Sequence, residues 1–237
     1  MKRSLILTIL VVLAVMGLSV GCGFVTGSGN LVSDTYDFSD FTIVEAHNGF
    51  QLEITRSTAF GIEITTDDNV QEYLEVNKSG DTLIIRLRGN RLYSSVTLEA
   101  SITMPELYGI DLSGGSRASI TDFSSSHDLS VELSGGSRIS GEITAADTDF
   151  ELSGGSRVDL AGSANDLVVD GSGGSQLDLE SFPVDNARIE LSGGGSATVN
   201  LDGRLDVDLS GGSRVLYVGN PTIGDRDLSG GSTVSNK

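Results

Sequence analysis

The residues of this chain that could do chemistry recur at a regular spacing. A glycine motif, Leu-Ser-Gly-Gly-Ser or a close variant, occurs seven times, and an acidic residue precedes every copy. These acids are Asp111, Glu132, Glu151, Asp170, Glu190, Asp208 and Asp227. An arginine directly follows four copies, at Arg117, Arg138, Arg157 and Arg214. Rows of carboxylates and guanidinium groups could pair with each other, hold cations or bind charged ligands.

Two interpretations of the acidic row are open. Stacked copies would place neighbouring carboxylates ~4.8 Å apart, where they repel by about 1 kcal/mol per pair in bulk water. Arginines facing the acids across the glycine turn would offset this repulsion as a ladder of ion pairs. Alternatively, Asp170 and Glu190, whose copies are followed by Gln176 and Ala197, hold a cation such as calcium or a basic group of a ligand. The arginine row itself is a candidate binding face.

Catalysis has little support in the sequence. His47 and His127 have no Cys or His companion, whereas a zinc site needs three or four ligands. No Gly-x-Ser-x-Gly elbow occurs between a strand and a helix, and the Ser-Gly-Gly-Ser turns lack the lysine and helix of phosphate-binding loops. A Ser-His-Asp triad stays open, because serine and aspartate occur throughout. We predict a protein that is not an enzyme and needs no cofactor, with calcium as the one ion considered.

The glycine motif is the turn of a repeated β unit. Successive copies begin 21, 19, 19, 20, 18 and 19 residues apart. An alternating stretch such as Val131-Glu132-Leu133 comes before the glycines, and another such as Arg157-Val158-Asp159-Leu160 comes after them, which is the pattern of half-buried strands. A hairpin meander and a parallel stack both fit this alternation. The regular spacing favours the stack, because stacking places like residues on like.

The predicted fold is all-β: a single-stranded parallel β-solenoid, or β-helix, with coils of about 19–20 residues. Residues 108–237 form the repetitive solenoid. Residues 31–107 alternate without a strict repeat, and we expect irregular β coils there that cap the open edge of the solenoid. Residues 31–237 would be one continuous domain.

The N-terminus carries an export signal. Lys2 and Arg3 precede an apolar run, Leu5 to Val20, that is short for a membrane span. We interpret residues 1–21 as a lipoprotein signal peptide and Cys22, the only cysteine, as the lipidation site; the alternative is ordinary cleavage that leaves a free thiol. The Gly- and Ser-rich residues 22–30 would be a flexible tether. The protein is then exported and lipid-anchored to the cell membrane or outer membrane, facing the periplasm or the exterior.

The chain is strongly acidic. Its net charge is −18, and removal of residues 1–21 takes away two cations and no acid, which brings it to −20. Such a charge excludes nucleic acid as a partner and disfavours electrostatic docking on anionic lipid headgroups.

The order of several short motifs resembles a known family. After the lipobox come Phe38-Ser-Asp-Phe-Thr-Ile43, Gly49-Phe-Gln-Leu-Glu-Ile54, Asp68-Asn69-Val70, Gly80-Asp-Thr-Leu-Ile-Ile85, Met104-Pro-Glu-Leu107 and the repeated glycine motif. Over about residues 38–234 this order is similar to that of the putative auto-transporter adhesin, head GIN domain family. The resemblance implies a β-helical fold and a cell-envelope location, and it brings no catalytic residues.

Three functions follow from these patterns. The first is a non-enzymatic binding or adhesion module, whose repeated polar face contacts surface polysaccharide or an envelope protein. The second is a structural envelope component without a small ligand, in which the solenoid is a spacer or self-assembles end to end. The third is an enzyme acting on polysaccharide, for which no cleft of carboxylates with aromatic or basic neighbours is visible. We favour the first.

Overall fold

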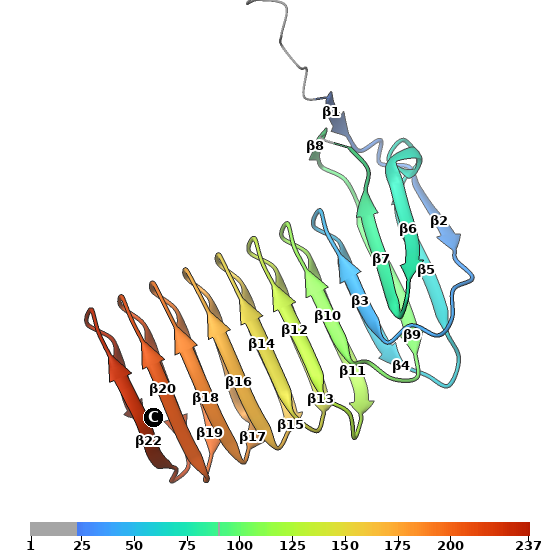
Figure 1. The fold of residues 1–237 in the computed structure, drawn as a ribbon. Helices are drawn as coiled ribbons and strands as arrows, with labels where there is room; N and C mark the ends of the chain where they lie inside the picture. Colours follow the sequence, from blue (N-terminus) through green and yellow to red (C-terminus); the bar gives the residue numbers. More distant parts are fainter. Residues whose placement is uncertain (1–22, 90) are drawn as a thin grey trace, which may run out of the picture.

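The computed structural model describes residues 23–89 and 91–237, which form two long β-sheets, a short two-stranded ribbon and the 3-10 turn η1 (Gln71–Tyr73) (Figure 1). The sheets run side by side along an elongated stack. The strands that belong to successive coils pair in parallel, so the predicted all-β parallel solenoid is confirmed. None of the described helical segments is long and apolar enough to cross a membrane.

Each copy of the glycine motif connects the two strands of one coil. The strand before the motif lies in the first sheet, in β10 (Gly109–Leu112), β12 (Leu129–Leu133), β14 (Thr148–Leu152), β16 (Asp166–Gly171), β18 (Asn186–Leu191), β20 (Arg204–Leu209) and β22 (Thr222–Leu228). The strand after it lies in the second sheet, in β11 (Arg117–Ser124), β13 (Arg138–Thr144), β15 (Arg157–Ser163), β17 (Gln176–Val184), β19 (Ser196–Leu201), β21 (Arg214–Val218) and β23 (Thr233–Asn236). The motif therefore turns the chain from one sheet to the other.

Alternation along each strand creates the core. In β12 the residues Leu129, Val131 and Leu133 are buried and the two residues between them are exposed. Because like positions pair from coil to coil, the buried residues of the two sheets form one continuous apolar cluster from Phe41 to Val215. This cluster joins the cap and the repeats into a single body.

The glycine turns are closed by a buried serine. The last serine of the motif is 0–1% exposed at Ser116, Ser137, Ser156, Ser175 and Ser213. Its hydroxyl donates a hydrogen bond of 2.7–2.8 Å to the carbonyl of the serine three residues earlier. Each buried hydroxyl thus has a partner inside its own turn, which removes the cost of burying it.

One copy of the motif carries an extra glycine, and this shifts its register. Gly195 takes the buried position that Ser175 and Ser213 hold in the neighbouring coils. Ser196 pairs with Gln176 and Arg214. The residue of this copy that corresponds to the arginines is therefore Ser196, not Ala197, which is 2% exposed.

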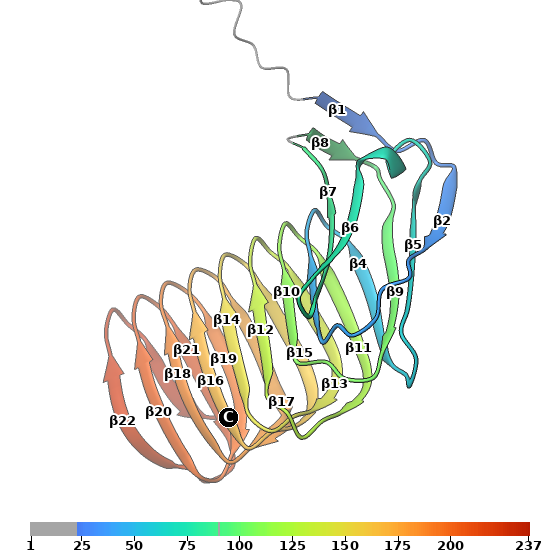
Figure 2. The ribbon, with the colours of Figure 1, turned by 45° about the vertical axis from the view of Figure 1, so that its right-hand side comes forward.

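The predicted N-terminal cap is confirmed, although the chain does not enter the stack in sequence order. It uses β2 (Leu31–Thr35), β3 (Ile43–Ala46), β4 (Gln51–Arg56), β5 (Gly61–Asp67), β6 (Leu74–Ser79), β7 (Thr82–Leu87) and β9 (Leu98–Met104). Strands β3 and β4 pair in parallel with β10 and β11 and so form the coil next to the repeats. Strands β7 and β9 add outside them, and the antiparallel strands β6, β5 and β2 complete the sheets (Figure 2).

Regular stacking begins earlier in the chain than residue 108, where we expected it. The stretch Ala46-His47-Asn48-Gly49-Phe50 joins β3 to β4 and is a degenerate copy of the glycine turn. Its amide hydrogen bond from Gly49 to the Ser116 hydroxyl links it to the next turn.

The segment expected to be a flexible tether is folded over its described part. Strand β1 (Gly23–Thr26) pairs in parallel with β8 (Arg91–Ser94). The Asp67 carboxylate, 1% exposed, accepts amide hydrogen bonds of 2.7 Å from both Gly29 and Thr97, and these bonds lower its pKa. Cys22 and the proposed signal peptide, residues 1–21, lie outside the described residues.

The turn glycines provide a test of the stacking. Gly173 has φ +74°, and a Cβ there would lie 2.6 Å from the Gly154 carbonyl oxygen, whereas a Cβ on Gly174 would have its nearest neighbour at 3.8 Å. We expect Gly173→Ala to reduce the free energy of unfolding by at least about 1–2 kcal/mol, the cost of the left-handed conformation alone. Gly174→Ala is the matched control, and equal midpoints in urea unfolding for the two variants would contradict this reading.

The Asp67 carboxylate predicts a pH dependence of stability. Because its pKa is lower in the folded state, it stabilises the fold above its unfolded pKa, and this contribution is lost as the pH falls through the folded pKa. Asp67→Asn should therefore be less stable than the parent at neutral pH, and the difference should narrow in acid. Asp68→Asn, which changes an exposed neighbour bonded to the Ser28 hydroxyl, should have a smaller effect in urea titrations at each pH. A difference that stays constant down to low pH would refute the assignment.

Candidate binding groove

The acidic row and the arginine row lie on opposite outer faces of the molecule. Asp111 stands between the buried Ile110 and Leu112 of the first sheet, and Arg117 stands between the buried Ser116 and Ala118 of the second. Within the described residues no ion pair joins the two rows. The predicted ion-pair ladder across the glycine turn is therefore wrong, because the turn carries the chain to the other sheet and points the two sets of side chains away from each other.

The acidic row is longer than the motif copies suggest. Glu45 of β3 pairs with Asp111 and extends the row into the cap. The pKa of Asp111 is raised, first by partial burial and then by the neighbouring Glu45 carboxylate. At this end His47 donates or accepts on both ring nitrogens: Nε2 lies 2.7 Å from Glu45 Oε1, and Nδ1 contacts the Ser113 hydroxyl.

Glu45, His47 and Ser113 stand in the order of a nucleophilic triad, which the sequence left open. One further carboxylate, Asp111, lies close enough to interact with both Glu45 and His47, and an oxyanion formed beside Ser113 would be disfavoured by its charge. What the contacts do is join the turn of the β3–β4 coil to the turn of the next coil.

Asp170 and Glu190, the predicted cation pair, are register neighbours on β16 and β18. Glu190 is bonded by Arg188 of its own strand, with Nε and a terminal nitrogen 3.0 Å and 2.5 Å from one carboxylate oxygen. A basic group thus already occupies one side of this pair. In the described part of the chain no group of three or more His, Cys, Asp or Glu residues has the arrangement of a metal site. Calcium at Asp170 and Glu190 stays a prediction.

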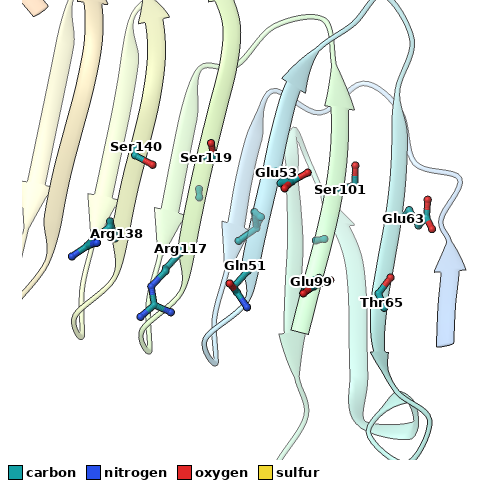
Figure 3. Close-up of a pocket in the computed structure, with 13 residues that line it drawn as sticks. Gln51, Glu53, Glu63, Thr65, Glu99, Ser101, Arg117, Ser119, Arg138 and Ser140 are labelled. Atoms are coloured by element: carbon teal, nitrogen blue, oxygen red, sulfur yellow. The ribbon is translucent and has the colours of Figure 1, made fainter. Parts of the chain in front are cut away.

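A hollow lies on the outer face of the second sheet, where the cap meets the first repeats. It has a volume of about 440 Å³ and crosses strands β5, β9, β4, β11 and β13 (Figure 3). Its polar lining residues are Gln51, Glu53, Glu63, Thr65, Glu99, Ser101, Arg117, Ser119, Arg138 and Ser140. We call this hollow the groove.

Sheet register explains both the position and the shape of the groove. One row across the strands reads Thr65, Glu99, Gln51, Arg117, Arg138, and the row two residues further along reads Glu63, Ser101, Glu53, Ser119, Ser140. Side chains two residues apart share a face of a strand, so both rows face solvent. The hollow lies where short serine side chains stand beside long charged ones.

The charges of the groove are divided between its two ends. Arg117 and Arg138 lie at the end over β11 and β13, and Glu53, Glu63 and Glu99 lie at the other, with Gln51 between Glu99 and Arg117 (Figure 3). Among the described residues, none of these five charged side chains has an ion-pair partner. Two arginines on adjacent strands can grip one carboxylate, since the guanidinium plane matches its geometry.

The structure brings together only part of the predicted arginine face. Arg117, Arg138 and Arg157 are neighbours in one row, but Gln176 and Ser196 separate them from Arg214. Only Arg117 and Arg138 line the groove. The sequence did not predict the acidic half of the groove, because β5 and β9 lie beside β4 only through the non-sequential strand order of the cap. Gln51 and Glu53 could have been found from the sequence, since they follow a turn that resembles the glycine motif.

This geometry defines a class of protein: an elongated parallel β-solenoid that displays a polar, charged outer face. The chain belongs to the putative auto-transporter adhesin, head GIN domain family, whose model matches residues 40–221. The family resemblance seen in the short motifs is thereby confirmed. No curated protein sequence matches the chain.

Several solved structures share the fold. A putative adhesin from Bacteroides fragilis has a TM-score of 0.83 and 21% identity, covering 90% of this chain and 100% of that one. A putative adhesin from Parabacteroides merdae has a TM-score of 0.68 and 17% identity, covering 91% of this chain and 99% of that one. A putative lipid binding protein from Parabacteroides distasonis has a TM-score of 0.72 and 16% identity, covering 90% of this chain and 99% of that one. At such identities the likeness shows the fold alone.

The groove arginines should matter little for stability. Arg117 and Arg138 are exposed like charges on adjacent strands, so we expect Arg138→Ala to change the free energy of unfolding by no more than about 0.5 kcal/mol. Arg86, which bonds both oxygens of Glu75, is the contrast, and Arg86→Ala should lower the thermal midpoint more. A larger loss for Arg138→Ala would assign it a structural role.

Proposed function

We propose that this chain is an exported, lipid-anchored cell-envelope protein that binds a surface ligand through the groove. The observation that carries the proposal is the set of five charged side chains around one hollow, none with an ion-pair partner among the described residues, on a rigid sheet. Membership of a putative adhesin family supports a surface location and a binding role. The lipid would be attached at Cys22, directly before the folded chain.

The ligand class follows from the two ends of the groove. Arg117 and Arg138 fit a carboxylate, while the acids, Ser101, Ser119 and Thr65 offer acceptors and donors for hydroxyl groups. A surface polysaccharide with spaced carboxylates has both kinds of group. The large negative charge of the chain disfavours dense polyanions. Among the residues that the structure describes, no aromatic side chain lines the groove, so each contact is weak and many copies on one cell surface would bind together.

The test is binding of residues 22–237, which hold every described strand, to a panel of polysaccharides and whole cells. We expect saturable binding to carboxylated polysaccharide, reduced at least about tenfold by Arg117→Glu with Arg138→Glu, a loss of about 1.4 kcal/mol. Arg214→Glu reverses one charge of the same row, half of the change in the double variant, outside the groove, and should leave binding unchanged.

Other outcomes would replace the proposal. Equal losses in both variants would indicate unspecific electrostatic attraction. Absence of binding, together with an apparent mass from light scattering that rises with protein concentration, would favour the self-associating spacer. Strands β22 and β23 are edge strands of the two sheets, and Ile223 is 39% exposed. Binding that needs calcium and is lost in Asp170→Asn with Glu190→Gln would move the site to the acidic row.

A further inference from the structure

The two-stranded ribbon of β1 and β8 exposes an apolar surface. Phe24 and Leu92 are 65% and 59% exposed, the two highest values among the exposed large apolar residues of the described chain. They are direct partners in the parallel ribbon, so their side chains stand next to each other on one face. The ribbon lies at the N-terminal end of the molecule, apart from the two long sheets (Figures 1 and 2).

The opposite face of the ribbon attaches it to the body. Val25 and Tyr93 pack against the core cluster, and the Tyr93 ring lies 6.2 Å from that of Tyr73. The Arg91 guanidinium lies 4.4 Å from the centre of the Tyr73 ring, an attractive cation–π contact. The ribbon is therefore attached to the body, and fraying of a strand does not explain its exposed apolar outer face. Within residues 23–89 and 91–237, no other side chain covers Phe24 and Leu92.

The position of the ribbon indicates what covers it. The described chain begins at Gly23, directly after Cys22. Phe24 is two residues after Cys22, so the two residues are within about 7 Å of each other along an extended chain. An acyl chain on Cys22 would hold this end of the protein at the membrane surface. The coils from β10 to β22 extend away from the ribbon, so the ribbon is the part of the fold that reaches the bilayer first (Figure 1).

We propose that Phe24 and Leu92 insert into the interfacial region of the lipid bilayer beside the Cys22 anchor. The inference rests on the proposed envelope attachment and adds a second contact to it. Apolar burial drives this contact, because the net charge of the chain gives no attraction to anionic headgroups. Two contacts on one rigid end orient the solenoid, so that the groove and the far coils are held away from the membrane.

The composition of the chain allows a direct test. It has no tryptophan and one cysteine, so Phe24→Trp introduces a single tryptophan that can be excited selectively, and Cys22 can be coupled to a maleimide lipid in phosphatidylcholine vesicles. Coupling tethers residues 22–237 whether or not cells acylate Cys22. Natural lipidation is measured separately, as the mass of the N-terminal peptide from cell membranes, so the two proposals fail independently.

We expect the Phe24→Trp emission to shift to shorter wavelength on the vesicles and to be quenched by lipids brominated in their acyl chains. Adding Leu92→Glu should abolish both effects, because a carboxylate opposes burial of its neighbour. Val168→Trp is the control, since Val168 is 42% exposed on β16 in the middle of the stack and should show neither effect.

Three results would overturn the inference. One is an unshifted Phe24→Trp spectrum in protein that is coupled to vesicles. The second is equal quenching of Val168→Trp, which would mean that the stack lies along the membrane. The third is a shift that depends on protein concentration without vesicles, which would assign the patch to a second copy of the chain.

Discussion

Parallel, in-register hydrogen bonding between successive coils is the constraint on which the rest of the structure depends. It continues through the turns, where the Gly174 amide donates to the Gly154 carbonyl and the Gly212 amide donates to the Gly193 carbonyl, at 2.7 and 2.6 Å. Turn backbones this close leave no room for a Cβ at positions such as Gly173 and Gly211. The glycine motif therefore repeats because every coil lies directly on the previous one. The buried serine at the end of the motif recurs for the same reason.

Stacking also places like charges on like, and the two faces of the solenoid meet this cost in different ways. The acidic face has cations from its own sheet: Arg188 beside Glu190, and Arg204 beside Asp206 and Asp225. The arginine face has uncharged breaks at Gln176 and Ser196. At its cap end this row changes sign within three strands, from Arg117 through Gln51 to Glu99. The groove lies at that change of sign, which is why it has arginines at one end and carboxylates at the other.

The cap and the repeats contribute different features to the molecule. The cap buries the open edge of the repeats, contributes the acidic half of the groove and carries the apolar ribbon at residues 23–26 and 91–94. Asp67 connects these parts, because its buried carboxylate accepts amides both from the loop after β1 and from the strand entry at Thr97. The proposed membrane contact and the proposed ligand contact are thus held on one rigid unit, while the repeats give the molecule its length.

The sequence by itself determined the solenoid, the coil length, the glycine turns and the family, because the regular spacing of strand, glycine turn and strand favours stacking like residues on like. It also placed Arg117 and Arg138 side by side. It could not reveal that acids and arginines face opposite ways, since this depends on which sheet each strand joins. Nor could it place Glu63 and Glu99 beside those arginines, or Phe24 beside Leu92. These contacts join segments far apart in the chain, and only the non-sequential packing of the cap brings them together.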